Sequence, residues 1–322
     1  MILSPEVLTI IIINIIFLVF GTIAFILSLK IFFNWNINAT SKKQYNLEKQ
    51  SFLTATIIKY ILFIKILLFI FFVFTLDKIS NVLTGAMCAA GVIDATSYGI
   101  YLLLFKLINI YLFGFWLFIH KFDMNTKELK YTKLKFGFYL FIFILFISEI
   151  IIEITMFSSI DVDKLVSCCG TIYSNSSESY ISSIFTLNQS LILIVFYSLF
   201  ALLILFYFLK NDYLYLIGNL LFLIASIISL IIFFGTYIYE LPSHHCPFCM
   251  LQKEYYYIGY FVYLTLFLGT FYGFAIGISN MLSQDKQKIK SYYKISMTFI
   301  IIYTLLVSYF PLFFYLKNGV FL

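Results

Sequence analysis

The stretch EVLTIIIINIIFLVFGTIAFILSLKIFF (residues 6–33) decides the fold class of this chain. It is longer than the about 20 mostly apolar residues that a helix needs to cross the hydrocarbon core of a bilayer. Seven more stretches have the same character, at roughly 53–76, 99–120, 136–159, 186–209, 214–237, 257–279 and 296–316. The sequence therefore predicts an all-α integral membrane protein with about eight transmembrane helices.

The composition agrees with this class. Of the 322 residues, 62% are hydrophobic and only 11% are charged, whereas about 25% of the residues of a soluble domain are charged. Because so few charges cannot cover the surface of a soluble protein of this size, lipid must surround much of the chain. The net charge of +6 gives no reason to expect a nucleic-acid partner. The expected partners are the lipid bilayer and other membrane subunits.

The lysines predict the orientation, because the loops richer in basic residues lie on the cytoplasmic side. One set of alternate loops holds fourteen lysines, in the ranges 30–52, 121–135, 210–213 and 280–295. The other set holds four: Lys78, Lys164, Lys253 and Lys317. For a bacterium, this asymmetry predicts a multi-pass protein of the inner (cytoplasmic) membrane with both termini outside.

All five cysteines fall in the lysine-poor loops, and we expect these loops on the periplasmic face. The five are Cys88, Cys168, Cys169, Cys246 and Cys249. Thiols on that face meet oxidants instead of a reducing glutathione pool. Five cysteines placed independently would share one face only about one time in sixteen. The co-location therefore indicates thiol or metal chemistry at that face.

The chain also looks like two tandem four-helix units. In LTGAMCAAGVI (residues 83–93) and LPSHHCPFCML (residues 241–251), a cysteine follows a leucine by five positions. Four helices return the chain to its starting side, so such units would share one orientation. The predicted first unit is 1–184, with Cys88 and Cys168/Cys169 in its outer loops. The predicted second unit is 185–322, with the C-x-x-C at 246–249.

The decapeptide HHCPFCMLQK (residues 244–253) is the most specific motif in the sequence. Its C-x-x-C is expected to open directly into a helix, with Pro247 suited to the first turn. The unpaired N–H groups and the dipole of a helix N-terminus stabilise a thiolate. Cys246 is therefore expected to be the more exposed and reactive thiol. Cys249, one turn further in, would resolve a mixed disulfide.

These residues resemble the DsbB-type membrane thiol oxidases, which carry C-x-x-C-x-x-[QE]-R at the outer start of a helix. Cys246, Cys249, Gln252 and Lys253 fall on those positions. The resemblance implies a redox-active disulfide centre that passes electrons from a periplasmic thiol protein to quinone, with Lys253 near the quinone ring. It covers about fifteen residues. The chain departs from the family in its number of helices, in its lysine for arginine, and in having its second cysteine pair before the C-x-x-C.

The position of Cys168 and Cys169 leaves several pairings open. Adjacent cysteines can close only a strained ring, and strained disulfides are the labile ones. Each is therefore expected to bond elsewhere, one to Cys88 or one by exchange with Cys246. A stable disulfide between loops, bracing a structural membrane subunit, is the plainest alternative.

A metal site is the rival interpretation of the same loops. His244, His245, Cys246 and Cys249 form a soft-ligand set suited to copper, zinc or mercury. Further soft side chains in the outer loops are Met87, Cys88, Cys168, Cys169 and Met250. A soft-metal transporter or metal-cofactor assembly factor, served by a metal donor, would need such a set. The histidines could instead orient the loop.

Four ionisable residues fall inside predicted spans, where charges are costly and are usually paired or functional. They are Lys65, Lys106, Glu149 and Glu153. The two glutamates are four positions apart and so share one helix face. The four are expected to form either an interhelical ion pair or a proton path or cation site.

Overall fold

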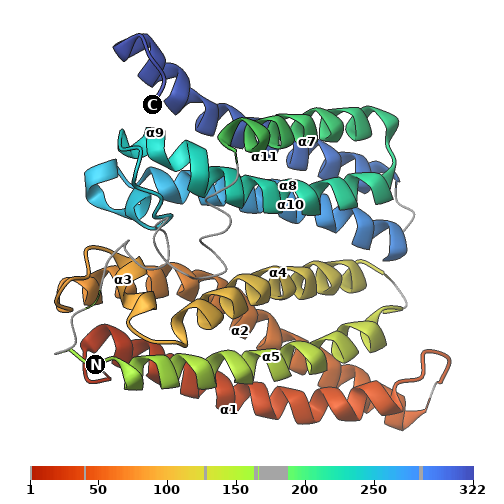
Figure 1. The fold of residues 1–322 in the computed structure, drawn as a ribbon. Coiled ribbons are helices and arrows are strands. Elements are labelled where there is room, and N and C mark those ends of the chain that lie inside the picture. The colour runs from red at the N-terminus through yellow and green to blue at the C-terminus, as the bar shows by residue number, and fades with distance from the viewer. Residues whose placement is uncertain (1, 40, 127–128, 163–165, 167–187, 283–285) are drawn as a thin grey trace. The chain divides into compact units, whose positions relative to one another are not determined.

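The part of the chain that the structure describes is mostly helical and contains no strand, and Figure 1 shows the helices packed lengthwise within each unit. The structure is a computed structural model that describes residues 2–39, 41–126, 129–162, 166, 188–282 and 286–322. Eight of its helical spans are long and apolar enough to cross a membrane. The predicted fold class, an all-α membrane protein with about eight transmembrane helices, is confirmed.

The first compact unit comprises Met1–Thr84 and Ala95–Leu165. Its four long helices form a closed ring, because α1 packs on α2 and α5, and α4 packs on the same two helices. Aromatic side chains fill the middle, among them the fully buried Trp116 and Tyr139. The helices are α1 (Pro5–Asn34), α2 (Lys42–Ser80), α4 (Gly99–Met124) and α5 (Thr132–Ser159).

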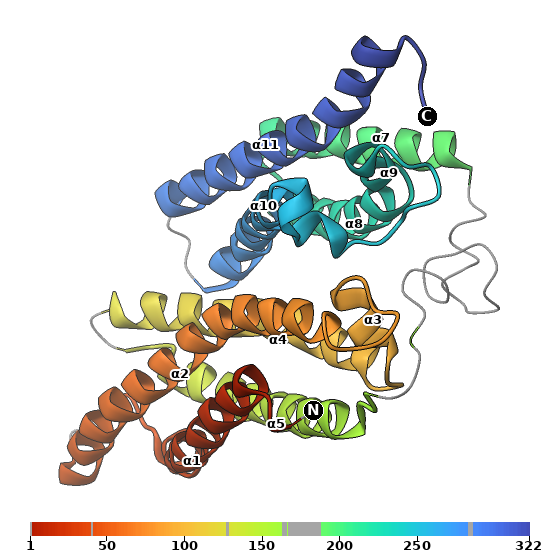
Figure 2. The ribbon, with the colours of Figure 1, turned by 90° about the vertical axis from the view of Figure 1, so that its left-hand side faces the viewer.

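The second compact unit comprises Gly85–Asp94 and Val166–Leu322. Figure 2 shows its α10 and α11 from a second side. In this unit α10 packs on α8 and α11, and α7 packs on α8. One span, Asp212–Tyr239, joins α8, a π-helical turn and α9. The elements are α3 (Ala89–Asp94), α7 (Gln189–Leu209), α8 (Asp212–Ser229), η1 (Leu230–Phe234), α9 (Gly235–Tyr239), η2 (Cys249–Leu251), η3 (Lys253–Tyr255), α10 (Ile258–Leu282) and α11 (Lys286–Asn318).

Polar side chains and one backbone conformation set the helix ends. The side chains of Ser41, Asn188 and Asn211 accept hydrogen bonds from the first-turn N–H groups of α2, α7 and α8, which is the usual chemistry of a helix N-cap. Lys210, with φ 52°, ends α7 in the left-handed region and turns the chain into α8.

The two compact units differ from the two predicted four-helix units in the segment Gly85–Asp94, which carries Cys88. This segment lies between two helices of the first unit in the chain, but it belongs to the second unit. Gly85 has φ +92° and lies so close to the carbonyl oxygen of Val166 that a Cβ there would collide with it. Gln252 Nε2 donates to the carbonyl oxygen of Met87 (3.1 Å). The packing of the segment, not its place in the chain, therefore decides the unit to which Cys88 belongs.

Candidate functional site

The C-x-x-C lies in an irregular connection between α9 and α10, not at the start of a long helix. Cys246 precedes a turn, Cys249 begins the three-residue 3-10 helix η2, and α10 begins only at Ile258. The expectation that the motif opens directly into a helix is therefore wrong. The backbone leaves the helical region first at Gln252, which is extended (ψ 163°), and again at Tyr256 and Tyr257, whose φ values are 53° and 56°.

Three cysteines converge in this connection. Cys88, just before α3, lies with its Sγ 3.5 Å from the Sγ of Cys246, although 158 positions separate them in the chain. The Sγ atom of Cys249 completes a group whose members all lie within 4.8 Å of one another. No disulfide joins any two of these three cysteines. The site thus combines the C-x-x-C with one cysteine from a distant loop.

All three side chains are buried. Cys88 and Cys246 are 0% exposed, and Cys249 is 5% exposed. The expectation that Cys246 would be the more exposed thiol is therefore wrong. The sulfur atoms lie against one another, and Phe248 and Met250, which flank Cys249 in the chain, are buried as well.

Two tyrosines hold the backbone of the motif. Tyr239, the last residue of α9, donates its hydroxyl proton to the carbonyl oxygen of Cys246 (2.5 Å) and accepts from the N–H of Met250 (3.1 Å). Tyr263 on α10 donates to the carbonyl oxygen of Pro247 (2.7 Å). The two helices therefore fix where both cysteines of the motif lie. Sequence reasoning missed these tyrosines, because 26 tyrosines in the chain hide two with a special role.

The two histidines lie beside the thiol group without joining it. The Nδ1 atom of His245 lies 3.0 Å from the carbonyl oxygen of Ile231 in the π-helical turn η1. His244 packs edge-on against the ring of Tyr239, with ring centroids 4.5 Å apart. Among the described residues, no histidine, aspartate or glutamate atom belongs to the group formed by the three sulfur atoms. His245 therefore anchors the loop to the membrane-spanning helix, which agrees with the orienting role.

Gln252 and Lys253 occupy different environments. Gln252 binds the backbone of Met87 and so ties the two cysteine segments together. Lys253 is exposed in η3. Their assignment to a quinone site remains a prediction. Cys168 and Cys169 lie outside the described residues, so their role also remains a prediction.

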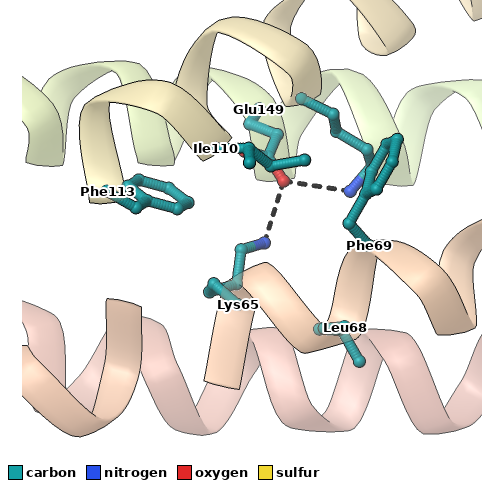
Figure 3. A pocket seen from close by; sticks show the side chains of 7 residues that line it. Lys65, Leu68, Phe69, Ile110, Phe113 and Glu149 are labelled. Atoms are coloured by element: carbon teal, nitrogen blue, oxygen red, sulfur yellow. Dashed lines mark hydrogen bonds and ion pairs between the residues drawn. The ribbon is translucent and has the colours of Figure 1, made fainter. Parts of the chain in front are cut away.

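The four predicted intramembrane charges meet inside the first unit. The ammonium group of Lys65 lies 2.9 Å from Glu149, and that of Lys106 lies 2.9 Å from both Glu149 and Glu153. All four side chains are buried, and their formal charges sum to zero. Figure 3 shows Lys65 and Glu149 facing each other from different helices. The interhelical ion pair expected from the sequence is present.

Two asparagines join this network, and Asn14 extends it to α1, the fourth helix of the unit. Asn14 on α1 donates to Glu153 (2.8 Å) and accepts from Lys65 (3.1 Å). Asn109 on α4 donates to Glu149 (2.5 Å). Every charged group therefore has at least two polar or ion-pair contacts, as a buried charge requires. Such a set fixes the register of four helices at once.

A small cavity lies against the network. It measures about 10 Å³, close to the room that one water molecule needs. Its polar wall consists of Lys65, Lys106 and Glu149. The apolar wall consists of Leu68, Phe69, Ile110 and Phe113. The neutral charge and the small volume favour a structural role. A proton path or cation site here stays a prediction.

No protein-family model, curated protein or solved structure matches the chain.

Proposed function

We propose that this protein binds a soft metal ion through Cys88, Cys246 and Cys249 and handles that ion at one face of a membrane. The observation that carries the proposal is the convergence of three buried sulfur atoms within 4.8 Å of one another. Thiolates are the ligands that soft ions prefer in proteins. The site would accept an ion from a metal donor and pass it on, as a transporter or a metal-cofactor assembly factor does.

The sulfur distances suit one shared ion. With metal–sulfur bonds of about 2.3 Å, three thiolates on one ion lie about 3.8 to 4.0 Å apart. The sulfur atoms of Cys88 and Cys246 are 3.5 Å apart, and no pair exceeds 4.8 Å. Shifts below about 1 Å would therefore complete the coordination.

Burial favours metal binding over exchange with a protein thiol. In thiol–disulfide exchange, the attacking thiolate must reach a sulfur atom directly. Cys246 is 0% exposed and Cys249 is 5% exposed, so a folded partner protein has no approach to either sulfur in this conformation. A small ion needs only a narrow opening of the connection.

The lysine asymmetry supports placing the site on the periplasmic side of a bacterial inner membrane, with both termini on that side. A soft-metal site there would receive its ion from outside the cytoplasm. Three thiols on an oxidising face would form disulfides unless a bound ion protected them.

The first experiment measures bound metal in the full-length chain in lipid nanodiscs. The reduced protein is offered Cu(I), Zn(II) and Cd(II) together without oxygen, and bound metal is measured by mass spectrometry. We expect about one ion per chain, lost in Cys246→Ser and in Cys88→Ser with the helical circular dichroism unchanged. The matched control, Cys168→Ser with Cys169→Ser, should keep its ion. Equal metal in wild type and Cys246→Ser would overturn the proposal, as would metal loss in the control.

A second candidate function is a DsbB-like thiol:quinone oxidoreductase, favoured by the 3.5 Å contact between Cys88 and Cys246. That separation is only about 1.5 Å longer than a disulfide bond. In this reaction two thiols lose two protons and two electrons to form a disulfide, and the quinone takes both to become a hydroquinone. Gln252 and Lys253 would lie near the quinone, and Cys168 and Cys169 would connect to the thiol partner.

The oxidoreductase candidate is tested with dithiothreitol as reductant and a water-soluble quinone. Turnover that disappears in Cys246→Ser and in Cys249→Ser supports it. Bound metal without such turnover would eliminate it.

A further inference from the structure

We infer that the Nε2 atom of His244 is the fourth ligand of the metal site, and that the three thiolates and this imidazole together hold one Zn(II) ion. This inference rests on the proposed metal-binding function and completes its ligand set. The observations that carry it are a buried nitrogen atom without a hydrogen-bond partner, the place of its ring beside the cysteine segment, and the donor set that results.

The Nε2 atom of His244 is buried and has no hydrogen-bond partner within the described ranges. Buried polar side-chain atoms in folded proteins almost always have a partner, and an exception indicates a bound ion, a water molecule or a catalytic role. His244 as a whole is partly exposed, so its ring lies at the edge of the site with this nitrogen on the covered side. An imidazole nitrogen is a preferred ligand of Zn(II). A metal ion would therefore satisfy the atom that lacks a partner.

The ring of His244 lies beside the segment that carries the thiols. It packs edge-on against Tyr239, with ring centroids 4.5 Å apart, and the hydroxyl group of Tyr239 binds the carbonyl oxygen of Cys246. His244 precedes Cys246 by two positions, and Cα atoms two positions apart are separated by at most about 7 Å. The nitrogen is not among the atoms that lie within 4.8 Å of one another, so the ring must turn about its side-chain torsions to reach the ion. That movement breaks no hydrogen bond of Nε2.

The neighbouring histidine has a different commitment. His245 places its Nδ1 atom 3.0 Å from the carbonyl oxygen of Ile231 in η1, and this contact holds its ring against the membrane-spanning helix. The Nε2 atom of His244 has no hydrogen bond of this kind in the part of the chain that the structure describes. His244 is therefore the histidine that can turn toward the ion, and His245 keeps the loop in place.

Three thiolates and one imidazole form a donor set that suits Zn(II). This ion is almost always four-coordinate and tetrahedral in closed protein sites, and three cysteines with one histidine are one of its common ligand sets. Four protein ligands leave no position for water, which agrees with the burial of the three cysteines, between 0% and 5% exposed. The site would therefore hold and transfer the ion, and would not use it to activate water.

The binding step balances in charge. The three cysteines release their S–H protons to solvent, and the histidine binds as neutral imidazole through the lone pair of Nε2. Three metal–sulfur bonds and one metal–nitrogen bond form, and no electrons are exchanged. Zn(II) with three thiolates carries one net negative charge, one fewer than a four-thiolate zinc site. The histidine thus lowers the charge that the buried site must hold.

The experiment loads the full-length reduced protein in lipid nanodiscs with Zn(II) without oxygen and records zinc X-ray absorption. We expect about three sulfur neighbours near 2.3 Å and about one imidazole nitrogen near 2.0–2.1 Å. His244→Ala should lose the imidazole scattering and bind Zn(II) about a hundredfold more weakly or worse, since even the outer-shell partners of a ligand are worth up to that factor. His244→Cys should restore tight binding, with about four sulfur neighbours.

Two further substitutions serve as comparisons. His120→Ala removes the third histidine of the chain, which lies on α4 of the first unit, and should keep both the affinity and the imidazole scattering. His245→Ala should keep the imidazole scattering. Circular dichroism checks that the helical content of each variant equals that of wild type.

The outcomes separate this inference from the proposed function. Imidazole scattering that persists in His244→Ala, or unchanged Zn(II) affinity in that variant, overturns the role of His244 and leaves metal binding standing. Four sulfur neighbours in wild type would place the fourth ligand at another cysteine and also overturn it, as would binding of Cu(I) without binding of Zn(II). Failure of wild type to bind Zn(II), Cu(I) or Cd(II) overturns both proposals.

Discussion

At the scale of single residues, the thiols of Cys88, Cys246 and Cys249 differ from ordinary buried cysteines in their mutual distance. A single buried cysteine usually behaves as a small apolar side chain. Packing alone gives no reason for three of them to place their sulfur atoms within 4.8 Å. The hydroxyl group of Tyr239 reinforces the arrangement, because it binds the backbone on both sides of the Cys246–Cys249 turn.

Replacing Tyr239→Phe tests this positioning role. The substitution keeps the ring but removes two buried hydrogen bonds, and losing a buried partner costs about 1–3 kcal/mol. We expect weaker Zn(II) binding, by about tenfold or more, while the helical content stays unchanged. Chelator competition gives the affinity and circular dichroism gives the fold. Tyr256→Phe is the matched control, since Tyr256 is 90% exposed, and it should bind as wild type does. Equal affinity in Tyr239→Phe and the control would contradict the role.

A second residue-scale prediction concerns the buried charges. Glu149→Gln leaves Lys65 and Lys106 with fewer compensating charges, and breaking a buried ion pair costs about 3–5 kcal/mol. We expect a loss of this size in detergent-induced unfolding. Glu254→Gln, at an exposed position, should be neutral. The double substitution Lys65→Met with Glu149→Met should recover part of the loss, because it removes opposite charges together. A neutral Glu149→Gln would show that the network does not stabilise the first unit.

At the scale of elements, the π-helical turn η1 between α8 and α9 is the distinctive feature. π-turns inside α-helices often occur at functional sites. Here the turn contains Ile231, whose carbonyl oxygen contacts His245 of the cysteine connection. Gly235 follows the turn and lies so close that a Cβ would be 2.8 Å from the carbonyl oxygen of Leu230. The turn therefore couples a membrane-spanning helix to the site.

Gly235→Ala tests this coupling. The new methyl group would meet a backbone oxygen, which cannot rotate away as a side chain can, so the turn must change. We expect a destabilisation of about 1–3 kcal/mol together with weaker metal binding. Thermal unfolding and chelator competition measure the two effects. Ser198→Ala, at an exposed position of α7, should change neither. If a destabilised Gly235→Ala protein binds metal as wild type does, the turn does not position the site.

At the scale of the whole molecule, the chain returns Gly85–Asp94 to the second unit although α2 and α4, its neighbours in sequence, belong to the first. This segment carries Cys88, the third thiol of the site. It also lets Gln252 bind the backbone at Met87 (3.1 Å). The site is therefore assembled from two segments of the second unit that are far apart in the chain.

Mild oxidation tests this assembly. In the metal-free protein we expect a disulfide between Cys88 and Cys246, because their sulfur atoms lie only 3.5 Å apart. Prior loading with Zn(II) should block its formation. Protease digestion and mass spectrometry without reduction identify the linked peptides. Independent alkylation of Cys88 under the same oxidation would refute the predicted contact.

The sequence by itself determined the membrane class and the eight helices, because lipid requires long apolar stretches and imposes this signal residue by residue. It also indicated that Lys65, Lys106, Glu149 and Glu153 would meet, since lone charges in hydrocarbon are too costly. The partners within that network depended on helix packing, as the contacts of Asn14 and Asn109 show.

Only the tertiary structure decided the character of the thiol site. The motif at Cys246 and Cys249 was visible in the sequence, but its burial, its irregular backbone and the approach of Cys88 were not. These properties arise from contacts across 158 positions and from positive φ values at Tyr256 and Tyr257. Local sequence carries little signal for either, because burial and long-range approach depend on how distant segments pack, whereas spanning a bilayer depends on each segment alone.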